Sequence, residues 1–73
     1  MPHKLSDADG EEAKKQASER APFGPGFPEP VVAMTVRLEV WGSSFKDDGG
    51  DWCEFRAFDA QGKSLATRRI DGY

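Results

Sequence analysis

Apolar residues occupy every second position between residues 31 and 41, and this period of two predicts a β-strand. The apolar positions are Val32, Met34, Val36, Leu38 and Val40. Successive side chains of a strand point to opposite faces, so one face of this strand is expected to be wholly apolar. A stretch rich in Gly, Ser and Asp follows at 42–50 and ends the strand.

Two further strands are predicted at 51–59 and 64–71. Between them, Asp59–Lys63 suits a hairpin turn closed by Gly62 in the left-handed conformation. The simplest topology is a three-stranded antiparallel meander with the second strand in the middle. In the register that this turn sets, Ala57 faces Leu65 and Trp52 faces Ile70.

The predicted sheet has two unlike faces. Its core face gathers nine apolar or small residues, namely Val32, Met34, Val36, Leu38, Val40, Cys53, Phe55, Ala57 and Leu65. The opposite face carries aromatic and Arg residues, which are the candidate binding residues: Trp41, Trp52, Phe58, Arg37, Arg56 and Arg68. Glu54, on the middle strand, is expected to bridge Arg37 and Arg68.

Residues 1–30 contain all five prolines and no Val or Ile, which predicts a disordered or weakly helical tail. Asp9 and Glu12 have capping-box spacing before a short helix at 10–20. Its apolar residues are alanines, which give no stripe to bury, so we expect it to fray. The whole fold is then mainly β: a flexible tail at 1–30 and a small β domain at 31–73.

The linker 21–30 contains two large apolar residues, Phe23 and Phe27. One interpretation is a docking peptide that inserts both rings into a groove of another protein. The favoured one is that the rings fold back onto the chain's own sheet, which needs a cover. A separate hypothesis places the natural start of the compact domain at Met34, with residues 1–33 as an extension.

A bare three-stranded sheet cannot cover its own apolar face, and the tail helix offers no stripe for the purpose. We therefore expect a second copy of the chain or a larger protein partner to supply the cover. The first strand, 31–41, is long, aliphatic and at an edge of the predicted sheet. Left uncovered, it would favour strand-to-strand association.

The chain carries a net charge of −3 with both signs interspersed, which argues against a dedicated nucleic-acid binder. Neither an apolar run long enough to cross a membrane nor a signal peptide is visible. One unpaired cysteine and the lack of an export signal predict a cytoplasmic protein.

The sequence offers little catalytic chemistry. Cys53 lies in mid-strand on the apolar face and His3 is the one histidine, so an activated thiolate is not expected. Asp47, Asp48 and Asp51 form an acidic loop without the ligand spacing of an EF-hand, and a solvated turn is favoured over a calcium site. We expect no enzyme, no cofactor and no metal.

One resemblance to a known family is carried by residues 51–67 and by the ending Ile70-Asp71-Gly72-Tyr73. An aromatic-rich strand, a turn containing Gly, an aliphatic-Ala-Thr strand and a Gly-Tyr ending together resemble the small YegP-like proteins. The resemblance implies a small β-rich protein without established catalysis.

These observations favour a non-enzymatic interaction protein that binds itself or a larger protein through its sheet face and edge strand. The alternative is a module that binds single-stranded nucleic acid, because Trp, Phe and Arg side chains on a sheet also stack on unpaired bases. The acidic balance of the chain favours a protein partner.

Overall fold

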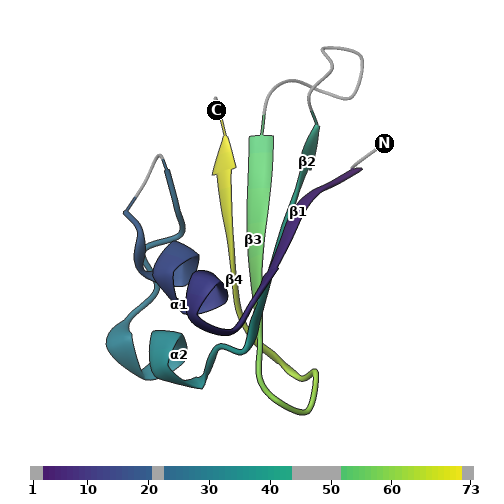
Figure 1. Cartoon of the computed structure of the whole chain (residues 1–73). Helices are drawn as coiled ribbons and strands as arrows, with labels where there is room; N and C mark the ends of the chain where they lie inside the picture. Colours follow the sequence, from purple (N-terminus) through teal and green to yellow (C-terminus); the bar gives the residue numbers. More distant parts are fainter. Residues whose placement is uncertain (1–2, 21–22, 44–51, 72–73) are drawn as a thin grey trace.

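The computed structural model describes residues 3–20, 23–43 and 52–71. Four antiparallel strands form one sheet in the order β1-β2-β3-β4, and two short helices lie against one of its faces (Figure 1). The elements are β1 His3–Asp9, α1 Gly10–Ser18, α2 Glu29–Met34, β2 Arg37–Ser43, β3 Trp52–Phe58 and β4 Ser64–Asp71. The prediction of a mainly β protein built on an antiparallel meander is confirmed.

The prediction that the chain begins as a disordered or weakly helical tail is wrong, because residues 3–9 form β1, a strand in addition to the three that were predicted. β1 pairs with β2 along its length, and Ala8 lies opposite Leu38. This pairing makes the strand at 37–43 an interior strand, whereas we had expected it at an edge. Residues 3–9 contain no β-branched or aromatic residue, so β1 depends on its ladder with β2 and carries no propensity signal of its own.

The prediction of a strand at 31–41 holds only for its second part, which belongs to β2, because residues 31–34 belong to the helix α2. Pro30 lies in the first turn of this helix, where a fixed φ favours helical backbone and no intrahelical N–H is needed. The helix ends at Thr35, whose hydroxyl donates to the Val31 carbonyl at 2.7 Å. Met34 and Val36, which we had placed in the core, are instead 56% and 40% exposed.

The helix predicted at 10–20 is confirmed as α1, but it packs firmly instead of fraying. Ala13 and Ala17 are both fully buried. Their small side chains let the helix lie close to the sheet, so two alanines provide the stripe that we considered missing. The core unites both halves of the chain: its buried apolar residues are Ala13, Ala17, Leu38, Cys53, Phe55 and Ala57.

Backbone and side-chain bonds tie α1 to the segment that follows it. Lys14 donates from Nζ to the carbonyls of Ala33 at 3.0 Å and Thr35 at 2.6 Å, and so caps the C-terminal end of α2. Phe27 donates its N–H to the Ala17 carbonyl and packs against the core, which confirms that this ring folds back. Phe23 does not fold back in the same way, since it remains 77% exposed.

The hairpin between β3 and β4 forms the predicted turn but not the predicted register. Gly62 has a φ of +80°, and the Asp59 carboxylate accepts from the N–H groups of Gln61 and Lys63. Phe58 pairs with Ser64, but Ala57 pairs with Ala66, so Leu65 is an extra residue in the ladder. This bulge shifts the rest of β4 by one position and brings Ile70 opposite Cys53.

Candidate interaction surface

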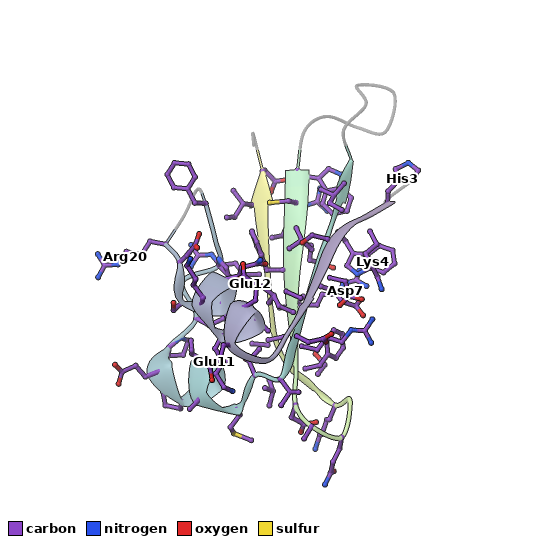
Figure 2. The ribbon with its side chains drawn as sticks, in the orientation of Figure 1. His3, Lys4, Asp7, Glu11, Glu12 and Arg20 are labelled. Carbon is purple, nitrogen blue, oxygen red and sulfur yellow. The ribbon has the colours of Figure 1, made fainter. Side chains whose placement is uncertain are left out.

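The sheet face opposite α1 and α2 is covered by no helix of residues 3–20, 23–43 and 52–71, and we call it the open face. Figure 2 shows Lys4 and Asp7 on this side of β1, away from α1. Strand alternation and pairing place the following described residues on the open face: Lys4, Asp7, Asp9, Arg37, Glu39, Trp41, Trp52, Glu54, Arg56, Phe58, Ser64, Thr67, Arg69 and Asp71.

The open face brings together five of the six candidate binding residues, namely Arg37, Trp41, Trp52, Arg56 and Phe58. The sixth, Arg68, lies on the other face. It pairs with Phe55 across the ladder and donates from Nη1 to the Pro25 carbonyl at 3.1 Å.

The six candidate residues do not include Arg69, which takes the place on the open face that the predicted register gives to Arg68. The cause is the bulge at Leu65, which exchanges the two faces for the rest of β4. A bulge of this kind leaves no residue-type signal, because Leu is equally acceptable in a regular ladder.

Each tryptophan of the open face lies under a cation. The guanidinium carbon of Arg56 is 4.8 Å from the centre of the Trp41 ring, and that of Arg69 is 4.3 Å from Trp52. Lys4 also approaches Trp41, with its ammonium at 5.7 Å. These separations lie within the range of cation–π attraction, which favours the observed positions of the two rings on the sheet.

Ion pairs link β1 to β2 across the open face. Arg37 binds Asp7 as a fork, with Nε and Nη2 at 3.0 and 2.8 Å from the two carboxylate oxygens. The same Nη2 lies 2.7 Å from Glu39, whose other oxygen accepts from the Trp41 indole at 2.8 Å. The Arg37 hydrogen bonds lower the pKa of Asp7 below its ordinary value, and Asp7 in turn raises the pKa of Arg37.

The predicted bridge from Glu54 to Arg37 and Arg68 is wrong. Glu54 accepts instead from Nε of Arg56, its neighbour on the same strand. Arg37 instead forms an ion pair with Asp7 of β1, the strand that was not predicted. The added strand therefore redistributes the charge pairs, while five of the six candidate residues share one face.

Cys53 lies on the opposite side of the sheet and is 1% exposed. Burial raises the pKa of its thiol, which disfavours the reactive thiolate. Among residues 3–20, 23–43 and 52–71, no three His, Cys, Asp or Glu side chains are placed to hold a metal ion. The acidic loop with Asp47, Asp48 and Asp51 falls outside the described residues.

Within the part of the chain that the structure describes, neither helix has the length and apolarity needed to cross a membrane. In comparisons with known proteins, no family model, no curated protein and no solved structure matches this chain. The resemblance to YegP-like proteins therefore stays a prediction from the residues that carry it.

Proposed function

We propose that this chain is a non-catalytic module that binds a larger protein through its open face. The observation that carries this proposal is the pair of tryptophans, Trp41 and Trp52, which lie under Arg56 and Arg69 on the face opposite α1 and α2. Trp and Arg are the residue types that contribute most at protein–protein interfaces. Because the cation–π contacts favour these positions before binding, less side-chain entropy would be lost on association.

The charges of the open face also favour a protein partner. Its described residues include four basic side chains (Lys4, Arg37, Arg56 and Arg69) and five acidic ones (Asp7, Asp9, Glu39, Glu54 and Asp71). A surface of mixed and nearly balanced charge is typical of the rim of a protein interface. A second copy is not needed as a cover for the core face, since α1 and α2 lie on that face.

Binding of single-stranded nucleic acid, the alternative function, is less well supported. The carboxylates of Asp7, Glu39 and Glu54 lie among the arginines and would repel a phosphate backbone. The two indole faces already stack on guanidinium groups, so a base would have to displace an arginine before it could stack.

An affinity-capture experiment with the full chain as bait tests the proposal. The double variant Trp52→Ala, Arg56→Glu should weaken capture of the partner by about 30-fold or more, because truncation at an interface hot spot costs roughly 2 kcal/mol or more. The matched control is Met34→Ala with Glu29→Arg, two exposed residues of α2 on the other side of the molecule, which should leave capture unchanged.

Circular dichroism of both variants should show the strand content of the original chain. Equal capture by the open-face variant and the original chain would contradict the proposal. A titration with a single-stranded oligonucleotide at low and high salt addresses the alternative, and saturable binding that salt removes would support nucleic acid as the ligand instead.

A further inference from the structure

A pocket lies on the helix side of the sheet, between α1 and β1, and we call it the α1–β1 pocket. It has a volume of about 360 Å³, within the range of pockets that take small organic ligands. Its floor is formed by Val40, Cys53 and Phe55, and Leu5 and Phe23 stand beside it.

The floor of the α1–β1 pocket is apolar, whereas its sides combine the apolar residues Leu5 and Phe23 with polar ones. Cys53 and Phe55 are 1% and 5% exposed, so the floor belongs to the core. Leu5 and Phe23, by contrast, are 48% and 77% exposed and offer apolar surface beside the floor. An apolar group of a ligand could therefore contact Leu5 and Phe23 at the pocket's side and the core residues at its floor.

The rim of the α1–β1 pocket is acidic. Glu12 and Glu19 line it together with Gln16, whose amide donates to one Glu12 oxygen at 3.0 Å. Neither carboxylate forms an ion pair with a residue of the described ranges, whereas Asp7, Glu39, Glu54 and Asp71 of the open face are all paired. Figure 2 shows Arg20, the next residue after Glu19, pointing away from the sheet.

The chemistry of the pocket therefore matches a cation with an apolar body. We propose that the α1–β1 pocket binds a small organic amine, with its hydrocarbon part against Val40 and Phe55 and its ammonium group between Glu12 and Glu19. The site is distinct from the open face and does not depend on the proposed function. Glu19, a half-buried residue, would bind the ammonium group, and the apolar floor would contact the hydrocarbon part.

Three probes of equal length but different charge test this proposal: hexylamine, hexanol and hexanoate. Each is titrated into the full chain while amide shifts are followed by NMR. Hexylamine should produce saturable shifts at Leu5, Glu12, Val40 and Phe55. It should bind about three- to fivefold more tightly than hexanol, as expected for exposed ion pairs, and hexanoate should not bind.

The double variant Glu12→Gln, Glu19→Gln should reduce the affinity for hexylamine to that for hexanol and leave hexanol binding unchanged. Glu11→Gln is the matched control, because Glu11 is an exposed neighbour on the same helix that does not line the pocket. A filling variant, Ser6→Leu on the pocket side of β1, should block both probes.

Three results would overturn the proposal. They are the absence of saturable shifts with hexylamine, equal binding of hexylamine and hexanoate, and shifts that fall on the open face instead of the pocket. The amide spectra of the variants report directly whether each one is folded, so a loss of binding can be assigned to the pocket.

Discussion

Two alanines determine how the first third of the chain packs. Ala13 and Ala17 are fully buried although each contributes a single methyl group. Because their side chains are small, the helix can approach the sheet closely. The α1 backbone then packs in one core with Leu38 and Phe55. An alanine stripe is difficult to recognise in a sequence, because alanine is equally common on exposed helix surfaces.

Enlarging one of these alanines should therefore destabilise the fold. Ala17→Leu adds three carbon atoms where no space exists, and we expect a loss of about 1–3 kcal/mol in the free energy of unfolding. Ala33→Leu, at an exposed position of α2, is the matched control and should change stability by less than about 0.5 kcal/mol. Urea denaturation measures both, and an equal effect of the two substitutions would refute close packing at Ala17.

Cys53 makes the stability depend on pH at the alkaline end. Burial raises the pKa of the folded thiol above its ordinary value of 9.0, so the unfolded chain loses this proton first as the pH rises. The contribution of the thiol is fully present below about pH 9 and decreases above it.

The variant Cys53→Ala lacks this titration. We expect it to be less stable than the original chain at pH 7, and the difference in the free energy of unfolding should narrow between pH 8 and 10. Denaturation curves at each pH provide the measurement. A difference that stays constant with pH would show that the thiol ionises equally in both states.

At the scale of elements, α1 and β1 are integral parts of the sheet's architecture. β1 supplies the partner for β2, and α1 covers the apolar face with Ala13 and Ala17. A chain that began at Met34 would keep three strands but lose the outer strand and the longer helix. The hypothesis of an internal start therefore leads to a stability test.

A fragment comprising residues 34–73 should not fold alone. The apolar face of its sheet would be exposed to water, and three strands without a cover are marginal. We expect a far-ultraviolet spectrum of disordered chain and no cooperative thermal transition, whereas the full chain should show both strand signal and a transition. Cooperative melting of the fragment would show that the strands at 37–71 carry enough core by themselves.

The sequence predicted β3, β4, the turn at Asp59–Lys63 and the helix α1, because each has a local signal in its periodicity or turn residues. It failed where the outcome depends on distant contacts. Residues 3–9 become a strand through pairing with β2, and Val31–Met34 become helical because the Pro28–Pro30 segment starts a helix that Lys14 then caps. Five of the six candidate residues lie on one face as predicted, whereas a bulge exchanges Arg68 for Arg69.

At the scale of the whole molecule, the sheet separates two surfaces of different character. On the open face, guanidinium groups lie over the tryptophan rings and charged side chains form ion pairs. On the helix side lies a pocket whose carboxylates, Glu12 and Glu19, form no ion pair with a residue of the described ranges. Both surfaces share one thin core, since Cys53, Phe55 and Ala57 of β3 are its central residues.

A single thin core predicts a single unfolding transition. The helix signal of α1 and the fluorescence of Trp41 and Trp52 should be lost at the same midpoint in urea, because the helix and the sheet bury the same residues. Loss of the helix signal at a lower urea concentration than the fluorescence change would indicate that the helical layer detaches independently.

Because Leu65 is an extra residue in β4, the C-terminal hairpin has two possible pairing registers, one with the bulge and one without it. An uninterrupted ladder would present Arg69 to the core and Ile70 to water, and the turn at Asp59–Lys63 is compatible with either arrangement. Closure of the turn thus does not decide which arrangement forms. Ile70 distinguishes the two arrangements, because it has apolar neighbours in only one of them. Packing on the helix side of the sheet therefore determines which residues lie on the open face.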